Sequence, residues 1–283
     1  MGETVALIGV GKMGRALLHR LKAEGHEVRA YDIAEEPMRT ARELGAVPAA
    51  SSAEAAKGAA IVHVFVCEDG EVLDATMRPA GVIEGAALCT LLILHSTILP
   101  ATTFLVGEAA KAREIDVIDA CVTSVPRRLQ AGQGIFLVGG PNDQVARARA
   151  HLLPLGREVH HFGPLGAGNT AKIAKNLTNG VERVMWAEVA MIVEAAGLDA
   201  RQFFDMAKAA SHGAMIEDWE RVVRIGDGPA LPQRAGGLFN KDIQHAARLA
   251  ADVGVAAPVT RAAAEEALQW VKEWGKETAA ETH

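Results

Sequence analysis

The sequence predicts an α/β fold in which a doubly wound parallel sheet is followed by a long connecting helix and an all-α C-terminal domain. Up to about residue 163, short apolar runs alternate with amphipathic stretches, and beyond that point the strand pattern stops. An unbroken stretch with apolar residues at helical spacing, Asn169–Ala196, follows directly. We therefore expect two domains, residues 1–163 and residues 164–283.

The first part of the chain contains the predicted strands. Several of them are rich in Val and Ile and apolar on both faces, as is typical of parallel strands that helices cover on both sides. Helices are predicted between them, including Met13–Ala23, Met38–Leu44 and Ala101–Ala112, and this alternation implies right-handed crossovers. The predicted strands are Thr4–Val10, Glu27–Tyr31, Ala60–Val66, Ala87–Leu94, Val117–Val122, Ile135–Val138 and Val159–Phe162.

The second part is predicted to be helical throughout. A helix over Asn169–Ala196 would be roughly 40 Å long at 1.5 Å per residue, which suits a spine that connects two domains. Pro229–Pro232 is expected to be a turn or linker. Four further helices are predicted, near Ala200–Ala209, Ala214–Arg224, Lys241–Val253 and Pro258–Trp274.

Composition excludes several classes of protein. The chain has 283 residues, a net charge of −6, 4% aromatic residues and a single Tyr, so neither a basic patch nor stacking platforms for nucleic acid are expected. Three cysteines without a CxxC pair indicate a reducing compartment, and no Cys/His cluster has metal-ligand spacing. Neither a membrane span nor a signal peptide is evident. We expect a cytoplasmic protein that contacts no membrane and holds no metal.

A glycine-rich motif with the pattern GxGxxG lies between the first predicted strand and the first predicted helix. In this context the glycines permit a tight turn, let the backbone approach a pyrophosphate, and let the helix pack closely, while the helix N-terminus attracts the anion. This predicts a Rossmann-like dinucleotide site, the alternative being a tightly packed helix start without a ligand. The residues are Gly9, Val10, Gly11, Lys12, Met13 and Gly14.

Asp32 follows the second predicted strand, where an acidic residue would hydrogen-bond the adenosine ribose. A carboxylate there repels the additional phosphate of NADP, and no Arg follows it. The predicted cofactor is therefore NAD. Asp32 has an alternative interpretation as the N-cap of the next helix.

Lys172 and Asn176 lie four residues apart in the long predicted helix, so they share one face. A Lys and an amide beside a glycine-rich helix start, Gly166–Gly168, are suited to polarising a carbonyl group. By themselves the two residues favour the simpler interpretation, a solvated Lys with an Asn on an exposed helix face.

Five motifs together resemble those of the β-hydroxyacid dehydrogenase family, which includes 3-hydroxyisobutyrate dehydrogenase and tartronate semialdehyde reductase and is related to 6-phosphogluconate dehydrogenase. They occur in the family's order and extend through most of the chain. The motifs are the GxGxMG opening at Gly9–Gly14, an STxxP segment at Ser96–Pro100, a DAPVSGG-like segment at Asp119–Val125, GxGxxxK at Gly166–Lys172 with Asn176, and a KDL-like segment at Lys241–Ile243.

The resemblance implies roles for individual residues. Lys172 is expected to be the general acid/base, and Asn176 to hold the substrate or orient Lys172. The implied substrate is a small anionic hydroxy acid or its semialdehyde, and the implied assembly is a homodimer or homotetramer. The residues expected at the substrate are Ser96, Thr123, Ser124 and Val125. Those expected at the cofactor, besides the glycine-rich turn and Asp32, are Cys67, Thr97 and Lys241.

The chain departs from the family pattern where SGG becomes Thr123-Ser124-Val125, which puts the substrate in doubt. Arg127 and Arg128 follow, either to bind a larger anion or as solvated side chains. His95 is expected either to contact the substrate or to be packed. Two other functions stay open: an imine reductase on the same scaffold, and an NAD-binding sensor without catalysis.

Overall fold

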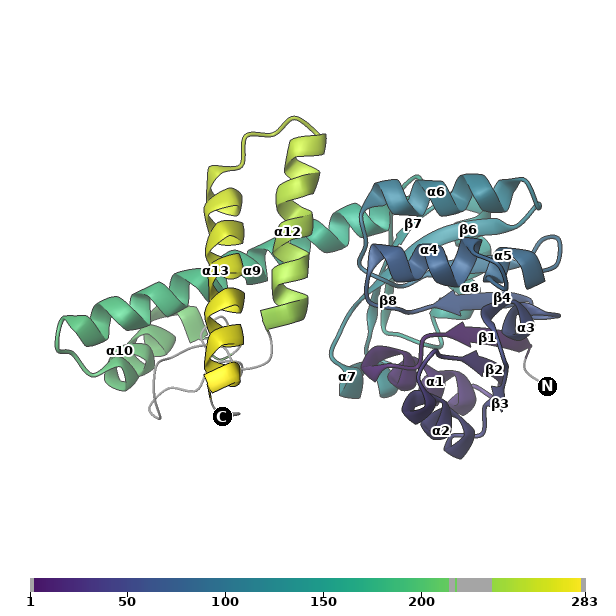
Figure 1. Cartoon of the computed structure of the whole chain (residues 1–283), viewed down its shortest axis with the longest axis horizontal. Helices are drawn as coiled ribbons and strands as arrows, with labels where there is room; N and C mark the ends of the chain where they lie inside the picture. The colour runs from purple at the N-terminus through teal and green to yellow at the C-terminus, as the bar shows by residue number, and fades with distance from the viewer. Residues whose placement is uncertain (1–2, 214–216, 218–235, 281–283) are drawn as a thin grey trace. The chain divides into compact units, whose positions relative to one another are not determined.

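The computed structural model describes residues 3–213, 217 and 236–280 (Figure 1). The chain divides into two compact units, residues 1–172 and residues 173–283. The first unit is an α/β domain and the second is helical, so the predicted fold class is confirmed.

One eight-stranded sheet forms the centre of the first unit, in the order β3-β2-β1-β4-β5-β6-β7-β8. The sequence order reverses direction between β1 and β4, which is the arrangement of a doubly wound Rossmann-like sheet. The central strands are fully buried because they carry apolar side chains on both faces. The strands are β1 Thr4–Ile8, β2 Glu27–Tyr31, β3 Val47–Pro48, β4 Ile61–Val64, β5 Leu91–Leu94, β6 Asp116–Thr123, β7 Ile135–Gly139 and β8 Glu158–Gly163.

Helices cover both faces of this sheet and close two separate apolar cores. One core contains side chains of α1, α2, α7 and α8, and the other contains side chains of α3, α4, α5 and α6. Pro100 and Pro126 start their helices at positions where a missing N–H costs nothing. The helices are α1 Lys12–Ala23, α2 Glu35–Glu43, α3 Ser52–Ala56, α4 Asp69–Met77, α5 Val82–Gly85, α6 Pro100–Lys111, α7 Pro126–Gln130 and α8 Asn142–Leu152.

Strand β7 departs from the predicted parallel sheet, because it pairs antiparallel with β6. Only residues 124–134 connect the two strands, and they contain a helix of five residues. A parallel crossover needs a dozen or more residues, so this connection returns the chain in the opposite direction. β8 then pairs parallel with β7.

Three predicted strands were too long, and one of them, Ala60–Val66, is shortened at both ends to Ile61–Val64. The first strand of the chain ends at Ile8 because Val10 belongs to the turn before α1. The strand predicted from Ala87 begins only at Leu91, because Cys89 adopts a φ of 60° and ends the extended conformation before it.

The second unit begins within the long helix α9, Ala167–Ala195, and continues with α10 Ala200–Ala207, the π-helical turn η1 Lys208–His212, α12 Gly236–Asp252 and α13 Pro258–Ala280. Its core forms around Trp186 and Phe204, whose rings lie 5.9 Å apart. Asp199 caps α10 by accepting the N–H groups of Arg201 and Gln202. The predicted helix Ala214–Arg224, apart from Glu217, and the predicted linker Pro229–Pro232 lie outside the described residues.

Candidate functional site

The glycine-rich turn connects β1 to α1 and has the geometry that dinucleotide binding requires. Gly9 has a φ of 89°, and a Cβ there would lie 2.5 Å from the carbonyl oxygen of Phe65, so only glycine fits. Gly11 is exposed at the N-cap of α1, and a Cβ there would meet nothing within 4 Å. The N-terminus of α1, beginning at the exposed Lys12, therefore faces open space where a phosphate group fits.

Asp32 closes this turn from the end of β2. Its Oδ2 accepts the N–H of Val10 at 2.7 Å, and its Oδ1 accepts the N–H of Ala34 at 2.9 Å. Helix α2 begins at Glu35 with Ala34 as its N-cap, so Asp32 is not the cap of that helix. A half-buried carboxylate beside the glycine-rich turn fits the ribose of a dinucleotide.

The segment after β5, which begins with Ser96 and Thr97, is held from three sides. The Ser96 hydroxyl accepts the N–H of Val66 and donates to its carbonyl, and Ser96 is only 1% exposed. Asp69 Oδ1 accepts the N–H of Leu99, and Asn169 Oδ1 accepts the N–H of Ile98. Thr97, between these anchors, is half-buried. Ser96 thus fixes the segment to the end of β4, whereas sequence reasoning expected it at the substrate.

Asp119 is a structural centre of the site that sequence reasoning did not assign. It lies in β6, fully buried, and its two oxygens accept the N–H groups of Gly166 and Asn169, each at 2.6 Å. These donors belong to the start of α9, where the helix dipole favours an anion. Burial raises the pKa of Asp119 to about 6, against the lowering effect of the backbone donors.

Gly168 explains why this carboxylate reaches the helix. A Cβ on Gly168 would lie 2.7 Å from Asp119 Oδ2, and one on Gly139 would lie 2.5 Å from Oδ1. The glycines of the GxGxxxK segment therefore permit close contact between α9 and the sheet. The signal in the sequence was an acidic residue inside an otherwise apolar strand.

Lys172 lies one and a half turns into α9, and its Nζ donates to the Thr123 hydroxyl at 3.5 Å. Thr123 ends β6, and both residues are half-buried. The structure thus brings together an ammonium and a hydroxyl that the sequence assigned to acid/base chemistry and to substrate binding.

The two residues after Thr123 lead into α7. The Ser124 hydroxyl donates to the carbonyl of Val125, and Val125 is 45% exposed. Val125 has a φ of −101°, an extended conformation that the following Pro126 favours. The bulk of Val125 is therefore accommodated without backbone strain. Arg127 and Arg128 are exposed on α7.

Asn176 and Lys241 belong to the second unit, where a shared carboxylate connects them. The Asn176 amide donates to Asp242 Oδ2 at 2.8 Å, and Lys241 Nζ lies 3.7 Å from Asp242 Oδ1. The resemblance to the KDL segment drew attention to Lys241 and left Asp242 without a role. The structure shows that Asp242 orients the Asn176 amide.

Cys67 and His95 differ in their exposure. Cys67 is exposed at the start of the α4 segment, and its N–H donates to Glu71 Oε2. His95 is 1% exposed, and its Nδ1 lies 2.7 Å from the Ala120 carbonyl oxygen. Of the two interpretations for His95, the structure matches the packed histidine.

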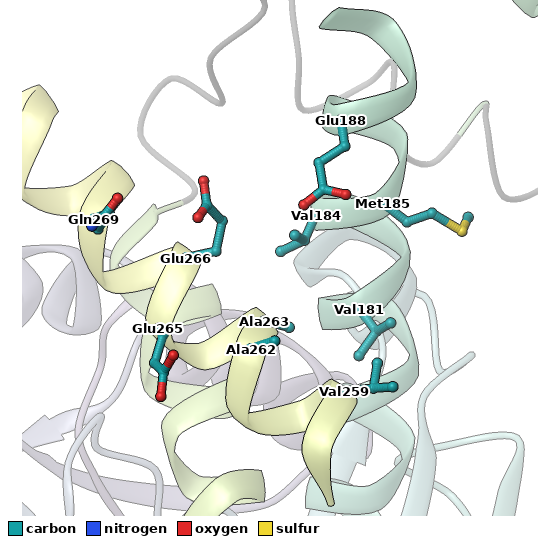
Figure 2. Close-up of a pocket in the computed structure, with 10 residues that line it drawn as sticks. All are labelled: Val181, Val184, Met185, Glu188, Val259, Ala262, Ala263, Glu265, Glu266 and Gln269. Atoms are coloured by element: carbon teal, nitrogen blue, oxygen red, sulfur yellow. The ribbon is translucent and has the colours of Figure 1, made fainter. Parts of the chain in front are cut away.

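A groove of about 510 Å³ lies in the second unit between α9 and α13 (Figure 2). Val181, Val184 and Val259 form part of its lining, and the carboxylates of Glu188 and Glu266 lie on its two sides. None of the predicted site residues lines it. Because its charged groups are acidic, it is unsuited to an anionic substrate.

Within the described ranges, no helix is long and apolar enough to cross a membrane. The same residues contain no group of three or more His, Cys, Asp or Glu side chains placed to hold a metal ion.

Two family models match successive parts of the chain. The NAD binding domain of 6-phosphogluconate dehydrogenase matches residues 4–163, and the NAD-binding model of NADP-dependent 3-hydroxyisobutyrate dehydrogenase matches residues 166–282. Together they account for nearly the whole chain.

Individual relatives agree with these models. A 3-hydroxyisobutyrate dehydrogenase of Pseudomonas aeruginosa is 32% identical, over 84% of this chain and 82% of that protein. A 3-sulfolactaldehyde reductase of Escherichia coli is 30% identical, over 92% of this chain and 88% of its own. The solved structure of Mycobacterium tuberculosis 3-hydroxyisobutyrate dehydrogenase with L-serine superposes with a TM-score of 0.81 at 27% identity, covering 96% and 94% of the two chains.

Proposed function

The chain belongs to the β-hydroxyacid dehydrogenase family and is an NAD-dependent enzyme of that family, and on this premise we propose that it interconverts a small anionic 3-hydroxy acid and its semialdehyde, with Lys172 as general acid/base. The observation that carries this proposal is the contact between Lys172 Nζ and the Thr123 hydroxyl. It supports a site in which a proton donor and a hydrogen-bonding group converge at the end of β6.

The nicotinamide cofactor supplies or accepts the hydride when it is bound. In the reducing direction the Lys172 ammonium donates a proton to the carbonyl oxygen of the substrate, and in the oxidising direction the neutral amine accepts the hydroxyl proton. Thr123 holds the Lys172 side chain until a substrate oxygen replaces it as acceptor. Asp119 contributes indirectly, because it fixes the first turn of α9 and therefore the position from which Lys172 extends.

The substrate is proposed to be anionic. The names of two relatives give their substrates as 3-hydroxyisobutyrate and 3-sulfolactaldehyde, and both of these compounds carry an acidic group. In this chain the hydroxyls of Thr123 and Ser124, which hydrogen-bond Lys172 and the Val125 carbonyl, would bind such a group by exchanging these partners for it. Val125 narrows the space that paired glycines would leave, so we propose a different preferred acid from 3-hydroxyisobutyrate.

We further propose that the enzyme is a homodimer or homotetramer. Several large apolar side chains of the second unit are more than half exposed within one chain, including Ile192, Leu198 and Met206. Light scattering at micromolar concentration tests this, and a monomer would contradict it.

The decisive experiment follows NADH consumption with a panel of short aldehydes. The panel pairs carboxylate-bearing and sulfonate-bearing semialdehydes with neutral aldehydes of matching shape, and it includes a cyclic imine. Turnover confined to the anionic aldehydes is the expected result. Turnover of the imine alone would favour an imine reductase, and NADH binding without turnover of any compound would favour a sensor.

A further inference from the structure

Three buried histidines form a continuous hydrogen-bonded chain through the first unit. His63, in β4, lies at the centre. Its Nδ1 is 2.8 Å from His95 Nε2, and its Nε2 is 3.0 Å from His151 Nε2 in α8. His95 Nδ1 completes the chain at the Ala120 carbonyl oxygen, 2.7 Å away.

The carbonyl end fixes the direction of every hydrogen bond. A carbonyl oxygen only accepts, so His95 carries its proton on Nδ1, and the Nε2 of neutral His95 must accept. His63 then donates through Nδ1 and accepts through Nε2, and His151 donates through Nε2. The neutral chain therefore has a single arrangement of protons, in which each ring satisfies its neighbour.

The inner end of this chain packs beneath the cofactor turn. The His95 ring lies 5.3 Å from the ring of Phe65, and the Phe65 carbonyl oxygen is the atom against which Gly9 packs. Ser96, the next residue after His95, holds both backbone groups of Val66. Phe65 and Val66 thus lie between the histidine chain and the glycine-rich turn.

The outer end of the chain reaches a surface recess of about 540 Å³. His151 is 9% exposed there, and His26 packs against it with ring centroids 5.0 Å apart. The other charged groups that line the recess are Glu3, Glu24 and Arg147. Solvent protons therefore have access to the chain through His151.

Within the described part of the chain, no acidic side chain is among the groups that act on His63 or His95. The charged groups that act on His63 are the other histidines, and burial together with these neighbours holds the pKa of His63 well below its usual range. Burial also lowers the pKa of His95 to about 4 and that of His151 to about 4. The pKa of each histidine is lower in the folded protein than the unfolded value of 6.5. The contribution of the three neutral rings to folding stability is therefore present above pH 6.5 and is lost as the pH falls toward 4.

We propose that His63, His95 and His151 are positioning residues that hold Phe65, Val66 and Ser96 in the arrangement required for NAD(H) binding only while all three imidazoles are neutral. Acidification would protonate the chain from the recess, break its single proton arrangement and release the backbone beneath the turn. The inference concerns cofactor binding and does not depend on the acid/base role of Lys172.

The test measures the Kd for NADH by fluorescence, without substrate, between pH 7.5 and pH 4. For the wild type we expect the Kd to rise by about 4-fold over this range, because pKa values of about 4 for His95 and His151 leave both rings neutral in about a quarter of the molecules at pH 4. His160→Gln is the matched control, since His160 is exposed on β8 and pairs with Glu158. The Kd of this variant for NADH should change with pH as the Kd of the wild type does.

Two substitutions of His63 separate hydrogen bonding from space filling. In His63→Gln, the amide donates to His95 and its oxygen accepts from His151, and neither group titrates in this range. In His63→Met, both hydrogen bonds are lost. We expect His63→Met to raise the Kd at pH 7.5 by about 10-fold, and His63→Gln to restore most of that loss and to show a weaker pH dependence. Identical profiles for all three proteins would overturn the proposal.

Nitrogen NMR of ¹⁵N-histidine wild-type protein provides a measurement that needs no variant. At pH 7 we expect the Nδ1–H tautomer for His63 and His95 and the Nε2–H tautomer for His151. Other tautomers, or an imidazolium at His63 or His95 at pH 6.5, would contradict the proposed chain.

Discussion

Asp32 and Asp119 perform the same local task in two different surroundings. Asp32 follows a strand of the sheet and Asp119 lies in one, and each accepts two backbone N–H groups with its two oxygens. Asp32 is half-buried beside an open turn, so it has room to bind a ligand as well. Asp119 is fully buried, and glycines bring helix and sheet close around it. The same hydrogen-bonding pattern therefore belongs to a candidate ligand site at Asp32, whereas at Asp119 it stabilises the contact between helix and sheet.

The largest expected effect concerns the residue that the Asp119 contact positions. Lys172→Ala should lower kcat by roughly 100-fold or more, because positioned acid/base catalysis contributes that much. The Kd for NADH should change little, since the glycine-rich turn is intact. Steady-state kinetics and NADH titration measure the two quantities. Near-normal turnover in a variant that binds NADH would exclude Lys172 as the acid/base.

Asp119→Asn tests whether the Asp119 carboxylate stabilises the start of α9. The amide nitrogen cannot accept the N–H that the lost oxygen accepted, so we expect the free energy of unfolding to fall by about 2 kcal/mol. Denaturant titration at pH 7 measures this loss. A change below about 0.5 kcal/mol would mean that the start of α9 does not depend on this carboxylate.

The same pair of proteins gives a pH dependence with a definite sign. The pKa of Asp119 is raised from 3.8 to about 6 in the folded state, so folding takes up a proton between these values. The stabilisation from this group is therefore greatest at low pH and is lost as the pH rises through about 6. The stability advantage of the wild type over Asp119→Asn should grow as the pH falls from about 6 toward 4. A constant difference would contradict the raised pKa.

Asp32→Asn is the matched substitution at the other carboxylate. The wild type should prefer NAD(H), and the variant should lose about 10-fold of that preference in the kcat/KM ratio, because repulsion of the NADP phosphate is removed. Its stability should fall less than that of Asp119→Asn, since water replaces a lost partner at a half-buried site. An unchanged ratio of kcat/KM with NAD(H) to kcat/KM with NADP(H) would show that Asp32 stabilises the turn and does not select the cofactor.

The smallest expected effect concerns substrate preference. Ser124→Gly with Val125→Gly should shift the kcat/KM ratio toward 3-hydroxyisobutyrate by roughly 1 kcal/mol, the lower end of what reshaping a pocket contributes. A panel of hydroxy acids with matched neutral alcohols measures the shift. The same ranking in parent and variant would exclude this loop as the determinant of specificity.

Local patterns in the sequence predicted the long buried strands, the helix α9 and the turn at Gly9–Gly14, because periodicity and glycine spacing are local properties. They did not predict β3, which has two residues, or the direction of β7, which depends on the length of a connection. For the site, the motif order predicted that Thr123 and Lys172 converge. The inward direction of the Ser96 hydroxyl and the partner of Asn176 arise from packing between distant segments, which no local pattern encodes.

The antiparallel direction of β7 determines which loops of the first unit lie beside the end of β6. Because β7 and β8 run opposite to β6, their amino ends lie beside Thr123, where Arg157 donates its N–H to the carbonyl of Gly134. Residues 124–134 and 153–157 therefore lie beside the end of β6, whereas Gly139, the last residue of β7, is level with Asp119 and with Leu94 at the end of β5. The first of these loops carries Ser124 and Val125, which makes it the natural target for a library that alters substrate choice, whereas the second contacts α1 because the Pro154 carbonyl accepts from Arg20.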